Sequence, residues 1–348
     1  MNNVGDVIIT ARRAAGITQE ELAERLGVTQ AALSRYENGQ RDVDPPTLAA
    51  LGRALDLSTD FLTHAFGLRG AIAADAHMRR QKTAKVSDWR RIEAQLNLIR
   101  MRSAFLLSRV GMRPENHLPT FDPLDTSPAD AARMLRAQWK FPIGPVRNLT
   151  AWMESAGILV IEYDFGTHRI DGMSQWAADY PVVIINSTLP TPRKRLTLAH
   201  ELGHLVLHSE FTTEDVEQQA NEFAAELLMP EHVIRPELTA LKPAKLRAMK
   251  RVWGVSMQAI FERAYRMKLV SATERTSFYR SMNAKGWKVH EPDDELVPPE
   301  TPRLAASIGD ALVTRGGLSR SEVARMCGRS SSAPETVFLS PDRRLHTV

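Results

Sequence analysis

Residues 193–208 have the sequence RKRLTLAHELGHLVLH, an apolar helical stretch interrupted by His200, Glu201 and His204. Two histidines four residues apart project from one face of a helix about one turn apart, which suits two imidazoles on a single Zn²⁺ ion. Glu201 lies about 100° around the same helix, where it can hold a water molecule as a general base. The stretch therefore predicts a helical zinc site with hydrolytic chemistry. A helix surface with two solvated histidines is the alternative.

A third metal ligand is expected from the helix predicted over residues 216–229, which carries three glutamates. At about 100° per residue, Glu217 shares a small apolar face with Ala224, whereas Glu222 and Glu226 fall on the opposite side, toward solvent. A carboxylate among alanines needs compensation, which a metal ion supplies. Glu217 is therefore the predicted third ligand. A local cap or ion pair at the helix start is the rival explanation.

Two further groups of residues on the histidine-bearing helix each allow more than one interpretation. His208 falls near the metal face and is predicted to support the site or to pack in the core rather than to bind the ion. Arg193, Lys194 and Arg195 precede the histidines and would favour an acidic substrate. A solvated helix start explains these three cations equally well.

The N-terminal residues predict short helices joined by tight turns. A helix over 19–26 has Thr18 as its N-cap, Gly27 makes the turn, and a second helix follows over 29–36. The second helix turns its apolar residues inward and leaves a polar outer face, which carries Gln30, Ala31, Ser34 and Arg35. Side chains of this kind can contact base edges and phosphates in a DNA major groove.

The run ITQEELAERLGVTQAALSRYENGQRDVDPPTLAALGRALDL, from Ile17 to Leu57, closely resembles the phage-repressor (Cro/C1, or Xre) helix-turn-helix family. The resemblance implies five helices and binding to a double-stranded DNA operator. It implies Gln19 against a phosphate, Gln30 and Arg35 in the major groove, and Arg12 and Asn38 near the DNA backbone. With Ser34 from the outer face, the predicted DNA-contacting residues are Arg12, Gln19, Gln30, Ser34, Arg35 and Asn38. Retention of the module for dimerisation or partner docking is the alternative.

The histidine-bearing stretch, followed by VEQQANEFAAELLMP, resembles the ImmA/IrrE family of zinc metallopeptidases, and the resemblance extends from Ala129 to Phe278. It implies a small sheet beside the helix, with a strand near residues 171–175 as an edge along which an extended substrate adds. The family pattern assigns roles to the same residues that the geometry selects: His200, His204 and Glu217 as zinc ligands and Glu201 as the catalytic residue.

Composition sets broad limits on the protein. The 348 residues are 43% hydrophobic and 25% charged, which is typical of a globular chain with two or three domains. No apolar run predicts a transmembrane helix, and the N-terminus lacks the pattern of a secretory signal. The single cysteine, Cys327, excludes an internal disulfide. We therefore expect a cytoplasmic protein with no membrane partner.

Charge is distributed unevenly along the chain. Residues 1–68 hold six arginines against nine acidic residues, a net charge of −3, whereas residues 69–113 hold eleven basic against three acidic residues, a net charge of +8. The basic segment could lie along a phosphate backbone. A solvated helix connecting two domains is the alternative, since apolar residues recur through the segment at helical spacing.

These patterns predict a multidomain protein: an all-α helix-turn-helix domain, an α+β zincin-like metallopeptidase domain with a small sheet, and a helical C-terminal tail. Strands are predicted at 157–163 (GILVIEY) and 181–186 (PVVIIN). The tail is expected to dock against the peptidase domain or to form a regulatory lid. The predicted parts are the DNA-binding domain over 8–66, a basic helical linker over 67–128, the peptidase domain over 129–285, and a proline-rich linker with the tail over 286–348.

The favoured function is a DNA-binding transcriptional regulator with a zinc-dependent endopeptidase domain. It would cleave a repressor or another regulatory protein, in a stress or mobile-element response that the family resemblance implies. One alternative is a repressor or antitoxin-type regulator whose zinc domain senses a ligand or is structural. Self-cleavage within residues 69–113 is another. Repressor-like modules usually bind paired half-sites as dimers, which leaves a homodimer open.

Overall fold

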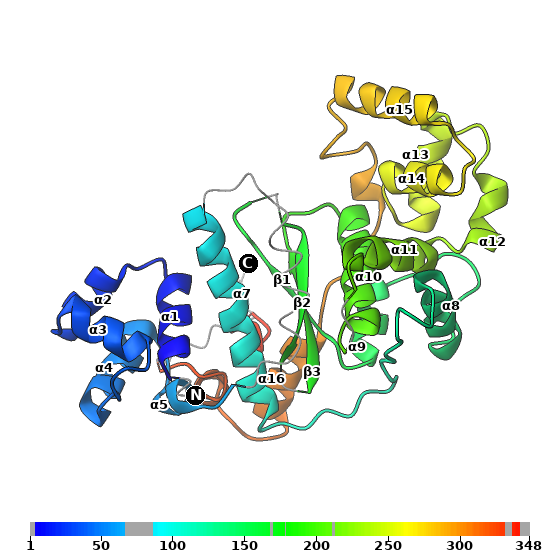
Figure 1. Ribbon diagram of the computed structural model, residues 1–348. Helices are drawn as coiled ribbons and strands as arrows, with labels where there is room; N and C mark the ends of the chain where they lie inside the picture. Colours follow the sequence, from blue (N-terminus) through cyan, green and yellow to red (C-terminus); the bar gives the residue numbers. More distant parts are fainter. Residues whose placement is uncertain are drawn as a thin grey trace, which may run out of the picture.

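The structure is a computed structural model that describes residues 4–66, 86–167, 170–177, 179–210, 213–330 and 336–341 (Figure 1). The first part of the predicted basic segment, residues 69–85, lies outside the described residues. Among the helices that are described, none is long and apolar enough to cross a membrane.

Residues 4–63 form a module of short helices whose ends are set by the sequence. Thr18 caps the second helix and forms a capping box with Glu21, and Thr29 caps the third. Gly5 allows the first helix to approach the third, because a Cβ there would lie 2.3 Å from the backbone oxygen of Glu37. The helices are α1 (Val4–Ala14), α2 (Gln19–Leu26), α3 (Gln30–Glu37), α4 (Pro45–Leu55) and α5 (Thr59–Thr63).

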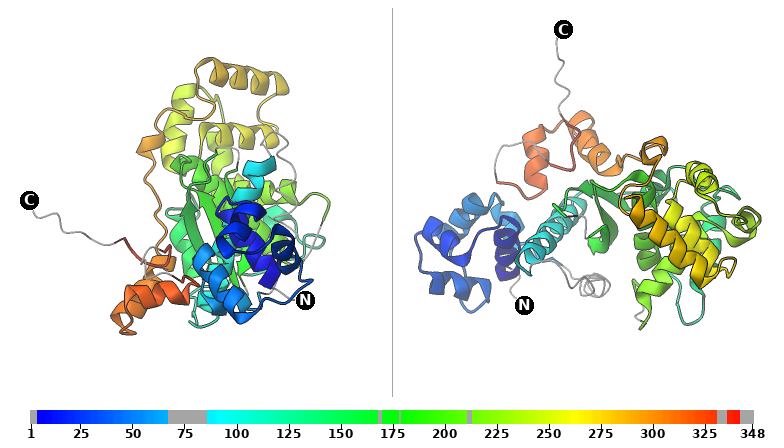
Figure 2. Two further views of the ribbon diagram at one scale, coloured as in Figure 1. Left: turned by 90° about the vertical axis from the view of Figure 1, so that its left-hand side faces the viewer. Right: turned by 90° about the horizontal axis from the view of Figure 1, so that it is seen from above.

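Helix α7 (Val86–Leu107) lies between this module and the sheet (Figures 1 and 2). Met101 and Phe105 are buried in the core of the module, whereas Leu96 and Leu106 are buried against the sheet. Two apolar faces explain why the helix is packed rather than solvated, and even Arg100 is only 6% exposed. Helix α7, which lies within the predicted linker, therefore contributes to two cores.

The sheet has three strands in the order β1-β3-β2: β1 (Leu159–Tyr163), β2 (Gly172–Ala177) and β3 (Tyr180–Asn186). The central strand β3 pairs in parallel with β1 and antiparallel with β2. Its side chains alternate, with Val183 and Ile185 in one core and Val182 and Ile184 in the other. A continuous apolar run is typical of a strand buried on both faces. Both predicted strands are confirmed, and the strand predicted near 171–175 is an edge strand.

One face of the sheet is covered by α7 and the other by α10 (Thr191–Leu207), which packs in turn on α11 (Val216–Leu228). Helices α8 (Pro128–Gln138) and α9 (Leu149–Ser155) complete this core. A further group of helices follows α11 in the chain and lies beyond it in Figure 1: α12 (Glu231–Ile234), α13 (Pro243–Trp253), α14 (Met257–Arg266) and α15 (Ala272–Ala284).

The acidic stretch 291–302, predicted as part of a linker, is tied to the domain by its carboxylates. Glu291 accepts hydrogen bonds from the backbone N–H groups of Met257 and Gln258, at 2.7 and 3.0 Å. Glu300 forms an ion pair with Arg195, a residue of α10. The stretch is packed because buried cations on the domain require these acidic partners.

The C-terminal tail contacts both the sheet and the N-terminal module. Its helices are α16 (Leu304–Thr314), which packs on β1, and α17 (Arg320–Met326), which ends beside the module. Ser58 donates its backbone N–H to the oxygen of Gly328 at 2.9 Å, and Arg329 pairs with Asp56. Docking on the peptidase side is as expected. The contact with the module was not anticipated, because no local pattern indicates it.

Replacing Gly328 by alanine should release the tail from the module. Gly328 has a φ of +82°, and a Cβ there would lie 2.1 Å from the fully buried ring of Phe61. We expect the Ser58 amide to lose protection in hydrogen-exchange measurements. Gly317→Ala is the matched control, since Gly317 also has a positive φ but open space around its Cβ. Equal protection of Ser58 in the two variants would contradict the contact.

Candidate metal centre

The site depends on an unusually close approach of α10 and α11. Gly203 on α10 faces Ala220 on α11, and a Cβ on Gly203 would lie 3.2 Å from the Cα of Ala220 and 3.1 Å from the ring of Phe223. Both helices are buried where they meet. A larger side chain at position 203 would separate them. The small pair therefore brings Glu217, one turn before Ala220, beside the histidines of α10.

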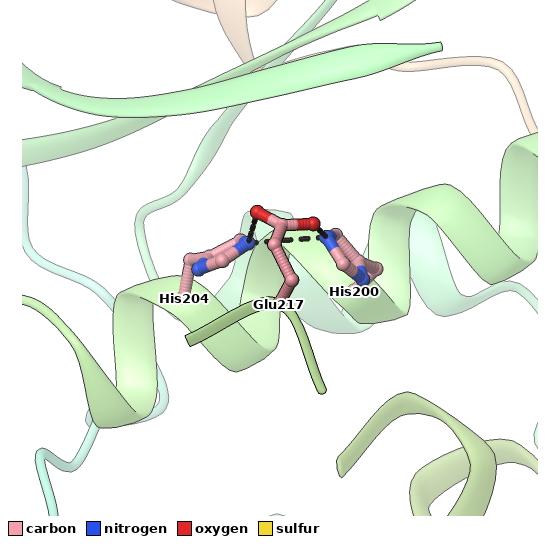
Figure 3. A group of neighbouring side chains, drawn as sticks. All are labelled: His200, His204 and Glu217. Atoms are coloured by element: carbon pink, nitrogen blue, oxygen red, sulfur yellow. Dashed lines mark hydrogen bonds and ion pairs between the residues drawn. The ribbon is translucent and has the colours of Figure 1, made fainter. Parts of the chain in front are cut away.

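His200, His204 and Glu217 point toward one another (Figure 3). The two Nε2 atoms are 3.0 Å apart, and each lies 3.6 Å from one carboxylate oxygen of Glu217. For Zn²⁺ with tetrahedral geometry and bonds of about 2.0–2.1 Å, ligand atoms should be about 3.3 Å apart. The two nitrogens and the carboxylate therefore fit one small divalent ion, and they leave a coordination position for a non-protein ligand.

Hydrogen bonds behind the histidines orient both rings. Asn221 donates to the backbone oxygen of Glu217 at 2.7 Å, and its Oδ1 lies 3.2 Å from Nδ1 of His200. Because this oxygen can only accept, the hydrogen of His200 is on Nδ1. Its Nε2 lone pair is therefore directed at the cluster.

The second ring is fixed through His208. Gln219 Oε1 accepts from Nε2 of His208 at 2.8 Å, which makes Nδ1 of His208 the acceptor for Nδ1–H of His204, at 3.0 Å. The lone pair of His204 Nε2 is then directed at the cluster. Burial lowers the pKa of His208, so its ring stays neutral as this arrangement requires. His208 thus fixes the ring of His204 by a hydrogen bond.

Glu201 is a buried carboxylate with one unsatisfied oxygen. The residue is 2% exposed, and its Oε2 accepts a hydrogen bond from the hydroxyl of Ser174 at 2.7 Å. Its Oε1 is buried and has no hydrogen-bond partner among the residues that the structure describes. Strand β2 runs directly alongside, since a Cβ on Gly172 would lie 3.6 Å from Cγ of Glu201. A buried acceptor without a partner is costly, and a water molecule held by an ion at the cluster would satisfy it.

Two adjoining cavities of about 440 and 790 Å³ lie beside the cluster. Glu217 lines the larger one, and the two share residues of α11 and α14, among them Asn221 and Arg263. The carboxylate of Glu217 is therefore reached from hollows of the size that small-molecule and peptide groups occupy.

The structure corrects two expectations about charged residues near the site. Glu226 does not face solvent: it is 1% exposed and forms ion pairs with Arg263 and Arg133. The prediction from helical periodicity took this side of the helix to be solvated, whereas it is covered by these two arginines. The three cations at the start of α10 do not form a free basic surface. They are paired within the domain: Arg193 with Asp171, Lys194 with Glu162 and Arg195 with Glu300.

The predicted DNA-contacting residues divide into an outer and an inner group. On α3 and just after it, Gln30, Arg35 and Asn38 are exposed and Ser34 is half-buried. The other two bind the buried carboxylate of Glu37. Arg12 is 9% exposed and donates to both oxygens of Glu37 at 2.6 and 3.0 Å, and Gln19 donates to it at 2.7 Å. Arg12 therefore lies inside the module instead of on its surface.

Three supporting residues were not identified from the sequence. Asn221 has a local signal, because it lies four residues after Glu217 on the same helix face. Gln219 and Ser174 have none, since each hydrogen-bonds to a residue of a different element: Gln219 to His208 at the end of α10, and Ser174 to Glu201 within α10.

Two parts of the chain match models of known families. Residues 8–62 match a model described as helix-turn-helix. Residues 153–265 match the model of peptidase family M78, described as IrrE N-terminal-like domain. The chain thus combines an N-terminal helix-turn-helix domain with an IrrE N-terminal-like domain, which carries the His–Glu cluster.

Curated relatives are similar over short stretches. The HTH-type transcriptional regulator ImmR of Bacillus subtilis (strain 168) is 42% identical over 60 residues, 17% of this chain and 47% of that protein. The SPbeta prophage-derived uncharacterized HTH-type transcriptional regulator YonR of the same organism is 38% identical over 64 residues, 18% of this chain and 59% of that protein. Uncharacterized immunity region protein 2 of Bacillus phage phi105 is 32% identical over 78 residues, 19% of this chain and 49% of that protein. The chain spans about half the length of these relatives.

Removing the carboxylate of Glu217 should remove the metal. We expect about one zinc ion per chain in the purified protein and little in Glu217→Ala, because two imidazoles alone leave the ion weakly held. Elemental analysis checks this. Glu222→Ala is the matched control, since Glu222 is on the same helix and outside the cluster. Equal zinc in the two variants would refute the ligand assignment.

Proposed function

We propose that this protein is a DNA-binding transcription regulator of the cytoplasm whose second domain is a zinc-dependent endopeptidase. It cleaves a repressor or another regulatory protein and so switches transcription. The observation that carries the proposal is the combination at one place of two oriented imidazoles, one carboxylate and the buried, unsatisfied oxygen of Glu201.

His200, His204 and Glu217 would hold the zinc ion, and Glu201 would act as the general base. When bound, a zinc ion there would supply Lewis-acid chemistry, polarising a peptide carbonyl and lowering the pKa of water toward neutrality. Glu201 accepts a proton on Oε1 and later delivers it to the leaving amine. Ser174 holds Oε2 by a hydrogen bond, so the other oxygen keeps one orientation. A structural zinc site usually has four protein ligands and needs no base, and this supports catalysis over a structural role.

Strand β2 supports an extended mode of substrate binding. It pairs with β3 along one side and is at the edge of the sheet formed by the described residues. Its residues Gly172 and Ser174 contact the helix that carries Glu201. A peptide added along the free side of β2 would gain main-chain hydrogen bonds and lie beside the general base.

The exposed side chains of α3 support binding to an operator. Gln30 and Arg35 lie at the exposed positions from which a recognition helix contacts base edges, with Ser34 and Asn38 toward the phosphates. The ion pair between Arg12 and Glu37 supports an internal role for Arg12, which positions Gln19 through the shared carboxylate. A peptidase joined to an operator-binding module meets regulators on the same DNA at a high effective concentration.

Replacing Glu201 by glutamine should abolish cleavage and retain zinc. Loss of a general base lowers the rate by about 10²–10⁴-fold. In cells that produce the wild type, sequencing of protein N-termini should find a few new termini in regulatory proteins, and these should be missing with Glu201→Gln and present with Glu222→Gln. The same termini with all three proteins would contradict the mechanism and leave a regulator with a metal-binding domain. A new terminus within residues 69–113 of this chain would indicate self-cleavage.

Replacing Gln30 and Arg35 together by alanine should weaken specific DNA binding. The DNA is obtained by selecting random duplexes on the wild-type protein, and affinity is measured at one fixed salt concentration. We expect at least a tenfold loss of affinity, because base contacts are lost. Arg53→Ala is the control, since Arg53 is an exposed arginine on α4 of the same module. A double variant that binds as tightly as this control would refute the assignment of α3.

A further inference from the structure

A cavity of about 1110 Å³ lies where the N-terminal module, α7 and the C-terminal tail meet, away from the metal centre. Ala11 and Ala14 of α1 line it on one side, Leu98 and Arg102 of α7 on another, and Leu339 of the tail on a third. Most of these side chains are apolar. Three segments that are distant in the sequence therefore border one space, and three arginines line it: Arg102, Arg320 and Arg329.

Arg102 is the unusual residue of this cavity. Its Nε is buried without a hydrogen-bond partner, and no carboxylate of the described residues forms an ion pair with its guanidinium. Burial lowers its pKa, and the neighbouring Arg329 acts in the same direction. Asp56 opposes this effect, but it is already paired with Arg329. Arg102 is half-buried. A cation partly withdrawn from water is normally compensated by an anion, which Arg102 lacks among the described side chains.

We propose that the cavity binds an amphipathic organic anion, whose acidic group pairs with Arg102 and whose apolar part lies against Leu98 and Leu339. The volume is close to the upper limit for a small-molecule site, and mostly apolar walls with a few charged groups are typical of such sites. Of the arginines in the wall, Arg329 is paired with Asp56 and Arg320 donates to the backbone oxygen of Ser340, so Arg102 is the one proposed to pair with the acidic group. This ligand is neither the substrate nor the metal of the proposed peptidase.

DNA does not fit this site. Helix α1 contacts α3 and also α7, and in Figure 1 the α2–α3 side of the module faces away from α7. The cavity is thus on the side of the module opposite to the face proposed for base contacts. Phosphates of an operator bound to α3 would not reach Arg102.

Because of the position of the cavity, ligand binding would affect how the DNA-binding module is held against the rest of the protein. An anion bound there contacts α1, α7 and the tail together, so it adds interactions between the DNA-binding module and the rest of the protein. It also removes the cost of the isolated charge of Arg102. Binding therefore stabilises this arrangement of module, helix and tail against arrangements in which they separate.

The test is calorimetric titration of the full-length protein with naphthalene-1-sulfonate, which combines an acidic group with an apolar body. Naphthalene-1-sulfonamide has the same shape without the charge, and inorganic sulfate has the charge without the apolar body. We expect saturable binding of the sulfonate, and at least tenfold weaker binding of both other compounds. Equal binding of the sulfonamide would overturn the role of the charge, and equal binding of sulfate would overturn the role of the apolar wall.

Variants locate the binding. Arg102→Gln should weaken binding of the sulfonate at least tenfold, whereas Arg90→Gln, an exposed arginine of the same helix, should leave it unchanged. Arg102→Gln should not lower the melting temperature of the free protein, because it removes an uncompensated charge. Val337→Glu, which adds a carboxylate to the wall, is a second variant and should also weaken binding. Equal affinity of the Arg102→Gln and Arg90→Gln proteins, or no saturable binding by the wild type, would overturn the proposal.

Discussion

The contact between Gly203 and Ala220 is the constraint on which the rest of the site depends. It lets α10 and α11 pack so closely that a carboxylate of one helix reaches two imidazoles of the other. As a result of this packing, the polar side chains of the site are buried between the sheet and α11. Each of them then needs a partner, because a buried polar group without one costs free energy.

The partners explain the chemistry as well as the stability of the site. Asn221 and His208 engage the Nδ1 atoms of the two histidines, and this leaves both Nε2 lone pairs directed at the cluster. Ser174 engages one oxygen of Glu201 and leaves the other unsatisfied. The two lone pairs and this carboxylate oxygen are the groups on which the proposed metal site depends. The site is thus organised before an ion or a substrate binds, which reduces the reorganisation that a reaction requires.

A second constraint joins the two functional parts of the chain. Helix α7 contributes Phe105 to the core of the module and Leu106 to the core against the sheet, so neither core is complete without it. The tail adds a further connection through Gly328 and Arg329. The DNA-binding module is therefore packed against the other domain rather than carried on a free linker. An event at either part can change the contacts of the other, and the cavity at Arg102 lies at this junction.

The sequence by itself determined the local features: the spacing of His200 and His204, the inward position of Glu217, two apolar strands and the helices of the module. These follow from periodicity and capping, which depend on residues within a few positions of each other. Only the tertiary structure decided the partners of buried charges. Glu226 was expected in solvent and is paired with Arg263, Arg12 is held by Glu37, and residues 291–302 are bound through Glu291. The pairing of these charged residues depends on how distant segments pack. Burial raises the free-energy cost of an unpaired charge, and the residues that are buried together cannot be read from a local sequence pattern.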